Sequence, residues 1–420
     1  MSEAIAPPTA APAEAARRPP ATSAPARYYR LTPWWVKVLV IFAASRVVTT
    51  SLMLAFAAAQ GTNAWTGASP DYFSFASLWD GHWYYIVSVS GYPATLPLTE
   101  AGEVGENAWA FMPGYPALVG LLSAALALPY KVIAVVVSMG FALGSSLMFY
   151  RLMALRLPAS TALFSVVLFC FAPLSPILQV AYAESMHLFF LIVGLFFLLQ
   201  RRYWLLLPVI AVMSLTRPSG LAFALALLLH LIYRWVVRRA DPFPLGERIA
   251  VVVIGLFSAF MGVLWPLLAW AATGSPSAYT DTELSWRAAY VGYTELLPFS
   301  AWIQGATWWQ DNWGWPAGAG VAVLVVLVVG FIAFMFTPAV RRLGVDLRFW
   351  VASYVLYLLA VFFPQSSTFR LLIPVFPLLG AIAQPRSALY RVGLVLLFIA
   401  GQVGWIYIGW WVDGYDWTPP

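Results

Sequence analysis

The sequence predicts an all-α polytopic membrane protein, and three observations lead to this class. Hydrophobic residues make up 62% of the chain and charged residues only 10%, with a mean hydropathy of +0.80, whereas soluble proteins carry about 25% charged residues. Apolar runs of membrane-spanning length recur along the chain. The basic residues lie in short groups between these runs, which is the pattern of membrane topology. We therefore expect membrane lipids as partners and no nucleic acid.

The N-terminal part sets the orientation. Residues 1–26 are rich in Ala, Pro, Ser and Thr and predict a disordered tail. Arg27, Arg30 and Lys37 then precede the first apolar run, at 36–59. Because basic residues flank membrane spans on the cytoplasmic side, we expect a cytoplasmic N-terminus in the plasma (inner) membrane.

The segment 61–130 predicts a first external loop. Between Gly61 and Ala110 it contains no Lys or Arg but several carboxylates. The apolar piece at 112–129 is short for a full crossing, and if it crossed, the later basic groups would lie on the wrong side. We therefore expect 112–129 to be an interfacial helix of this loop.

The later apolar runs predict ten further spans, which with the first make about 11 crossings. The segment 274–316 contains six tryptophans and several prolines and predicts a second large external loop. A short external tail, 412–420, would follow the last span. The ten expected spans are 131–150, 159–176, 184–200, 203–216, 218–236, 249–271, 317–337, 349–363, 371–385 and 391–411.

Asp80 is the strongest catalytic candidate. It lies between Trp79 and the aromatic run that begins at Trp83, in the first external loop. Apolar and indole surroundings would raise the proton affinity of its carboxylate and suit it to accept a proton from a hydroxyl. His82 either shares this work or makes a structural hydrogen bond.

Two arginines at the expected outer ends of spans are candidate phosphate ligands. Arg217 lies in Leu-Thr-Arg-Pro-Ser-Gly, and Arg370 follows Gln-Ser-Ser-Thr-Phe. A guanidinium offers paired donors that match a phosphate, and a helix that starts after Pro218 would add partial positive charge. Lys131 and Arg287, also on the outer side, are interpreted as snorkelling side chains or as members of helix-end ion pairs.

Glu184 and His187 lie three residues apart at the outer start of a span, which places both on one helix face. Ionisable residues at membrane depth are functional candidates, and this spacing also fits half of a metal site or proton relay. The chain has three histidines and one cysteine, Cys170. A histidine-rich metal site and an intrachain disulfide are therefore not expected.

Five short motifs occur in an order that resembles one family. They are Trp79-Asp80, Phe111-Met-Pro-Gly-Tyr-Pro116, Tyr182-x-Glu184-Ser185, Thr216-Arg217-x-x-Gly220, and Arg370 with Pro374 and Pro377. Together with the topology, over residues 35–385, they resemble the PIG-V family of mannosyltransferases and its bacterial, chiefly actinobacterial, members.

The resemblance implies a GT-C glycosyltransferase fold in which residues 27–411 form the transmembrane catalytic domain. It implies a polyprenyl-phosphate-mannose donor and a lipid or glycan acceptor in the cell envelope. Asp80 would be the catalytic acid-base residue, Arg217 and Arg370 would hold the donor phosphate, and no cofactor or metal is demanded. Residues expected in the substrate cavity are Trp79, His82, Tyr115, Tyr182, Glu184 and His187.

Three alternatives stay open at this point. A GT-C enzyme of this kind can use another lipid-linked sugar, such as arabinose or glucose. A lipid-linked-sugar transporter or flippase would be expected to carry charges near the membrane midplane and to show internal repeats. A non-catalytic assembly partner would keep its activity when Asp80 is replaced.

Overall fold

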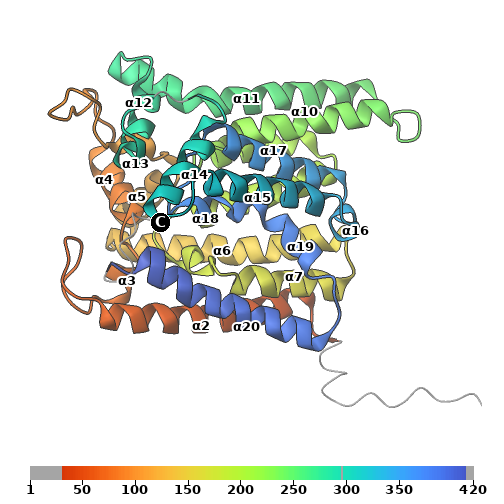
Figure 1. The fold of residues 1–420 in the computed structure, drawn as a ribbon. Helices are drawn as coiled ribbons and strands as arrows, with labels where there is room; N and C mark the ends of the chain where they lie inside the picture. The colour runs from red at the N-terminus through yellow and green to blue at the C-terminus, as the bar shows by residue number, and fades with distance from the viewer. Residues whose placement is uncertain (1–30, 295–296, 413–420) are drawn as a thin grey trace, which may run out of the picture.

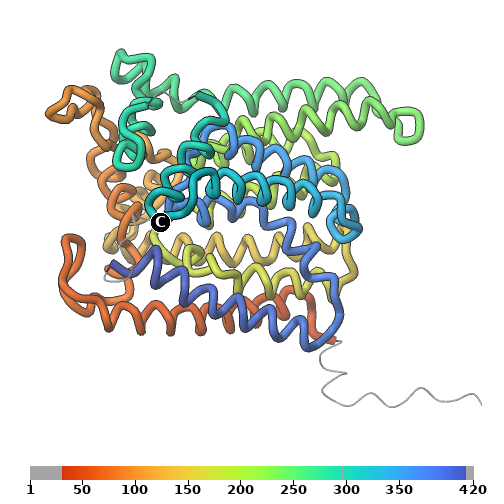
Figure 2. The backbone as a smooth tube through the Cα atoms, viewed as in Figure 1, coloured from red at the N-terminus to blue at the C-terminus, as the bar shows by residue number. Residues whose placement is uncertain are grey.

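The computed structural model describes residues 31–294 and 297–412, and the regular elements in these ranges are helices. They run lengthwise between two ends of the molecule (Figures 1 and 2). The expected tail at 1–26 and nearly all of the expected tail at 412–420 lie outside the described residues.

Four helices in the described part are long and apolar enough to cross a membrane: α2 (Trp34–Ala59), α6 (Tyr130–Ala154), α11 (Leu245–Thr273), and the continuous segment of α20 (Ala388–Trp405) with η5 (Ile406–Trp410). Shorter apolar helices pack among them. The all-α class is confirmed, and the chain is an integral membrane protein. The shorter apolar helices are α5 (Gly114–Leu126), α7 (Ala159–Phe171), α8 (Glu184–Leu199), η3 (Tyr203–Leu205) continuing into α9 (Leu206–Ser214), α10 (Gly220–Val236) and α15 (Ala319–Met335).

Short helices gather mainly at one end, which we call the loop end (left in Figure 1). It contains α3 (Tyr72–Phe75), α4 (Asp80–Ser90), α12 (Ala278–Ser285) and α13 (Ala288–Val291). The remaining elements are η1 (Ala108–Ala110), η2 (Ser175–Gln179), α14 (Ser300–Asn312), α16 (Pro338–Arg341), α17 (Val345–Val361), α18 (Thr368–Leu371), η4 (Ile373–Leu378) and α19 (Leu379–Ile382).

The two segments predicted as external loops pack against each other at the loop end. The side-chain amide of Asn107 donates to the hydroxyl of Thr282 over 2.9 Å. The rings of Trp83 and Trp286 meet edge to face, with centroids 5.5 Å apart. Such aromatic pairs add stability beyond the apolar area they bury. The first loop, which carries Asp80, is therefore held in place by the second.

Two predicted spans differ from the structure. Residues 371–385 do not form one continuous helix but pass through α18, η4 and α19. Pro374 and Pro377 lack the N–H group that an α-helix needs, which explains the short 3₁₀ turns. Helix α7 ends at Phe171 rather than near 176, and η2 follows it.

The break after α7 is stabilised by Arg46 of α2, a buried cation in the first span. Its guanidinium donates to the backbone carbonyls of Cys170 (2.8 Å) and Ser175 (3.1 Å) and to Oε1 of Gln179 (3.0 Å). Carbonyls freed at a helix end need donors when no water is near. Arg46 therefore acts as a structural cap between α2 and the α7–η2 turn.

Helices α10 and α11 pack closely because two glycines meet between them. A Cβ built on Gly220 would lie 2.6 Å from the backbone nitrogen of Gly262, and one on Gly262 would lie 2.6 Å from that of Leu221. Small residues permit this close approach of backbones, as is common between membrane helices.

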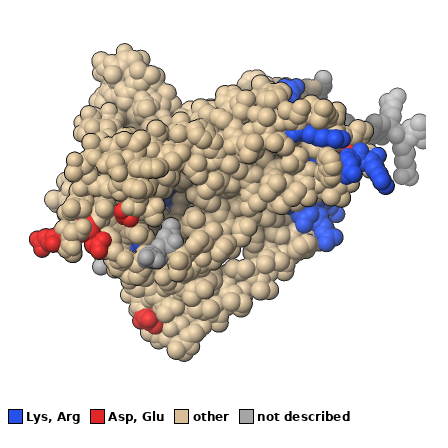
Figure 3. Space-filling model, turned by 90° about the horizontal axis from the view of Figure 1, so that it is seen from above, with Lys and Arg blue, Asp and Glu red and all other residues tan. Residues whose placement is uncertain are grey.

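The charges are divided between the two ends (Figure 3). Exposed arginines gather opposite the loop end, and we call that end the basic end. Exposed carboxylates, including those of Glu100, Glu103 and Glu106, belong to the first predicted loop. The exposed arginines of the basic end include Arg202, Arg238, Arg239, Arg341 and Arg342.

Candidate functional site

Asp80 is the first residue of α4 and is 8% exposed. Its backbone N–H donates to the hydroxyl of Tyr182 over 3.1 Å. A carboxylate in the first turn of a helix is stabilised by the unsatisfied N–H groups there. The preceding residue, Trp79, has a φ of 57° and a ψ of −122°, a strained backbone for a residue with a side chain. Such strain is concentrated at functional sites.

Arg370 lies directly against Asp80 although 290 positions separate them in the chain. Its Nη1 forms a buried ion pair with Oδ2 of Asp80. Its Nε lies 3.4 Å from Oε1 of Glu184. The short helix α18 therefore brings one guanidinium between two carboxylates.

Glu184 and Arg217 complete the arrangement. Glu184 is the first residue of α8, and its Oε1 is ion-paired with Nη2 of Arg217, in the turn between α9 and α10. Its other oxygen, Oε2, is buried and has no hydrogen-bond partner among the described residues. The Arg217 side chain is 16% exposed, so the protein does not enclose it completely.

Asp80, Glu184, Arg217 and Arg370 form what we call the charge cluster. Its two carboxylates and two guanidiniums balance one another, and both carboxylates begin helices. Buried charges require such pairing because an isolated one is very costly. The surroundings of Asp80 thus differ from the apolar setting expected from its aromatic neighbours: an arginine, rather than an indole, faces its carboxylate.

Tyr182 and His187 lie beside the charge cluster. The ring of Tyr182 packs under the guanidinium of Arg370, 5.2 Å from ring centroid to Cζ. His187 is 3% exposed, and its Nε2 is 3.0 Å from the hydroxyl of Ser219, which precedes α10. Tyr182 therefore positions both Asp80 and its partner arginine, and His187 ties α8 to the start of α10.

Three other expected cavity residues make hydrogen bonds outside the charge cluster. The indole N–H of Trp79 donates to the carbonyl of Trp410, 2.9 Å away. The hydroxyl of Tyr115 is fully buried and is bonded to the carbonyl of Ala134, also at 2.9 Å. His82 uses Nδ1 in a 3.1 Å contact with a backbone carbonyl, that of residue 77. Trp79 and Tyr115 thus hold neighbouring helices together, whereas His82 lines a separate cavity treated below.

Glu283 of α12 is an acidic residue near the cluster that the sequence interpretation did not single out. It is hydrogen-bonded to Tyr279, one helical turn earlier. Burial raises the pKa of Glu283 to about 7, while the bond to Tyr279 and the charge of Arg217 lower it. The signal for this residue was an acidic side chain in a tryptophan-rich external loop, which also fits a solvated carboxylate.

The described residues contain no group of three or more His, Cys, Asp or Glu side chains arranged to hold a metal ion. The two carboxylates of the charge cluster are instead paired with arginines. The chemistry that this cluster offers is anion binding by guanidinium groups next to a proton acceptor.

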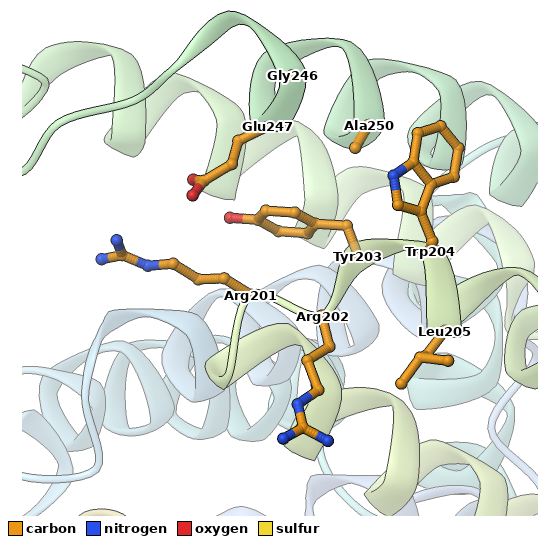
Figure 4. A pocket seen from close by; sticks show the side chains of 8 residues that line it. All are labelled: Arg201, Arg202, Tyr203, Trp204, Leu205, Gly246, Glu247 and Ala250. Carbon is orange, nitrogen blue, oxygen red and sulfur yellow. The ribbon is translucent and has the colours of Figure 1, made fainter.

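A cavity of about 370 Å³ lies at the basic end, between residues 201–205 and 246–250 (Figure 4). Glu247 and Tyr203 face one another across it, and Arg202 points away. Glu247 accepts a 3.0 Å bond from Arg234, and Arg201 is ion-paired with Asp241. The first pair joins α10 to α11, and the second joins the turn after α8 to the loop between α10 and α11.

No family model matches this chain, and no curated protein matches it. Among solved structures, the chain is similar to the oligosaccharyltransferase of Archaeoglobus fulgidus, which was crystallised tethered to an acceptor peptide containing the NVT sequon. The TM-score is 0.45 with 13% sequence identity, over 91% of this chain and 56% of that one. This chain thus spans little more than half the length of that structure.

Proposed function

We propose that this chain is a membrane glycosyltransferase of the GT-C type. It moves a mannosyl residue from polyprenyl-phosphate-mannose to a hydroxyl group of a cell-envelope glycolipid or glycan, with inversion at the anomeric carbon. The observation that carries this proposal is the charge cluster. Its four residues come from four separate segments of the chain, and each belongs to a motif that resembles the PIG-V family.

The arginines would bind the donor phosphate. The hydrogen bond of Arg217 to Glu184 uses Nη2, so Nε and Nη1 of Arg217 are not engaged by that bond. Arg370 has a further amino group, Nη2, beyond the two nitrogens that face Asp80 and Glu184. A guanidinium can serve two anions at once through its separate donors. An incoming phosphate would thus share both arginines with the carboxylates.

Asp80 would be the general base. When the donor phosphate draws Arg370 toward itself, the Asp80 carboxylate is freed to accept a proton. The acceptor O–H gives that proton to Asp80 while its oxygen bonds to the anomeric carbon. The bond between this carbon and the phosphate oxygen breaks, and its electron pair stays on the polyprenyl phosphate. The two guanidiniums would stabilise the charge of this leaving group.

The division of charge supports an extracytoplasmic active site. Exposed arginines at the basic end fit the cytoplasmic side under the positive-inside rule. The loop end, with the charge cluster and residues 61–130 and 274–316, would then face outward. The N-terminus would be cytoplasmic, and α5 would lie at the outer interface.

Transport of a lipid-linked sugar is the main rival. A transporter binds its substrate near the middle of the membrane, between repeats that alternate in access. Two residues of the charge cluster, Asp80 and Glu184, are instead the first residues of helices, and α4, which begins with Asp80, belongs to the loop end. Transfer therefore fits the placement of the charges better than transport does.

The test is transfer by the purified full-length protein in lipid nanodiscs. Polyprenyl phosphates carrying radiolabelled mannose, arabinose or glucose are each supplied with a lipid extract of the native membrane as acceptor. We expect label from the mannose donor in a new glycolipid or glycan. Transfer from arabinose or glucose alone would change the donor assignment. A parallel assay in sealed proteoliposomes follows the donor across the bilayer, and its movement without any transfer would refute the proposal in favour of a flippase.

A further inference from the structure

A second cavity, of about 640 Å³, opens beside α4 at the loop end, and none of the four residues of the charge cluster lines it. Gly81, His82 and Tyr85 of α4 line it, whereas Asp80 and Tyr84 do not. Residues four apart share one helix face, and residues one apart do not. Its volume falls within the range of about 300–1,000 Å³ typical of small-molecule sites. We call it the α4 pocket.

Aromatic rings form much of the wall of the α4 pocket. Trp65 is 38% exposed, and its ring meets His82 edge to face with centroids 5.1 Å apart. Tyr85 is 49% exposed and packs against Tyr130, with centroids 5.3 Å apart. The C–H face of a pyranose packs on such rings, because both surfaces are flat and apolar, while its hydroxyls reach polar groups at the ring edges.

Polar groups without partners accompany these rings. The hydroxyl of Ser77 is buried at the pocket and has no hydrogen-bond partner in the described part of the chain. His82 uses Nδ1 in its contact with the carbonyl of Ser77, so within the described part of the chain this contact leaves Nε2 for another partner. A buried hydroxyl left unsatisfied costs free energy that a ligand hydroxyl would recover.

The charges that line the α4 pocket favour a neutral ligand. Asp71 and Lys131, both lining residues, are ion-paired over 3.5 Å, so the pocket has no unbalanced cation for a phosphate. The hydrogen bond from Ser74, together with Lys131, lowers the pKa of Asp71. The carboxylate therefore stays ionised and accepts hydrogen bonds, as sugar hydroxyls require.

We propose that the α4 pocket binds neutral hexose units of a glycan, as a subsite for the acceptor at a distance from the reacting hydroxyl. The role as an acceptor subsite rests on the proposed function. The binding of carbohydrate itself is inferred from the residues that line the pocket and does not depend on that function. Asp80 is not among the residues that line the pocket, although its neighbours Gly81 and His82 are. The sugar held there is thus not the one that reacts, and the pocket would select longer or branched acceptors.

The experiment measures binding of mannose, mannobiose and mannotriose to the full-length protein in nanodiscs by saturation-transfer NMR, with matched gluco- and galacto-oligosaccharides. Trp65→Ala and Tyr85→Ala should each weaken binding by about tenfold, the loss expected for one stacking contact. Trp204→Ala is the matched control, because this exposed tryptophan lies at the basic end. It should bind as the wild type does. Thermal melts of all three variants identify any that are unfolded.

The outcomes separate this inference from the proposed function. Binding that falls in Trp65→Ala and Tyr85→Ala but persists in Asp80→Asn supports the subsite, whether or not transfer is found. Failure of every oligosaccharide to bind the wild type, or normal binding by folded Trp65→Ala and Tyr85→Ala, overturns it. Transfer activity with the second result would leave the proposed function intact and remove only the subsite.

Discussion

The ion pair between Asp80 and Arg370 yields a quantitative prediction about stability. Their side chains are 11% and 9% exposed, so water screens the pair little. Arg370→Gln leaves the Asp80 carboxylate buried without its partner, which costs about 3–5 kcal/mol. Asp80→Asn is milder, about 1–3 kcal/mol, because Arg370 keeps its 3.4 Å contact with Glu184. The double variant has no orphaned charge at this position. We therefore expect a coupling free energy of about 1.5–3 kcal/mol between the two sites.

The assay is reversible unfolding in mixed detergent–SDS micelles, followed by tryptophan fluorescence, for the wild type, both single variants and the double variant. The exposed pair of Lys131 and Asp71 supplies the matched control. Its cycle, with Lys131→Gln and Asp71→Asn, should give a coupling of about 0–1 kcal/mol. Additive effects at Asp80 and Arg370, within about 0.5 kcal/mol, would refute the buried pair.

Three further predictions concern stability, and the single buried cysteine permits a common assay, because a thiol-reactive dye labels it only on unfolding. Burial raises the pKa of Glu283 from 4.5 to about 7, so the folded chain holds a proton that the unfolded chain loses, and the free energy of unfolding falls as the pH rises from 4.5 to 7. Glu283→Gln should therefore have the melting temperature of the wild type near pH 4.5 and a higher one above pH 7. Equal melting temperatures of the two proteins at pH 8 would contradict this. Gly262→Ala should lower the free energy of unfolding by about 1–3 kcal/mol, because the new Cβ would lie 2.6 Å from the backbone of Leu221. An unchanged melting temperature would contradict this and show that α10 and α11 separate easily. Arg46→Lys should lower the free energy of unfolding by on the order of 2 kcal/mol, because an ammonium cannot replace the paired donors of the guanidinium. A stability like that of the wild type would rule out the capping role.

Apolar length predicted most helices correctly because a helix in a membrane must satisfy its own backbone. The ranges of α2, α6 and α11 lie within a few residues of the predicted spans. The sequence analysis predicted one continuous span where the structure has the separate short helices from α18 to α19, although Pro374 and Pro377 indicate an interruption there. Hydropathy over a window averages such interruptions away.

The sequence predicted which residues belong to the candidate site but not which of them form ion pairs with one another. Asp80, Glu184, Arg217 and Arg370 were each identified from local signals: charge at an outer helix end, aromatic flanks and short motifs. Which carboxylate faces which guanidinium depends on how distant helices pack, and one sequence does not encode that as a local pattern. The pairing of residues 80 and 370 thus became visible only in the structure.

Arg46 illustrates a different gap. Its place inside the first predicted span is visible in the sequence, yet its acceptors are carbonyls at a helix break more than 100 positions away. The sequence places that break only approximately. Glu283 was missed because its burial comes from the packing of the second loop, which composition alone does not determine.

The most direct test of the account is the single-turnover rate of mannosyl transfer by Asp80→Asn in nanodiscs, measured beside donor binding. The wild type should transfer labelled mannose from polyprenyl-phosphate-mannose. The variant should bind the donor but transfer it about 10²–10⁴-fold more slowly, the usual contribution of a general base. Transfer by Asp80→Asn at the rate of the wild type would contradict the assignment of Asp80 and the mechanism built on the charge cluster.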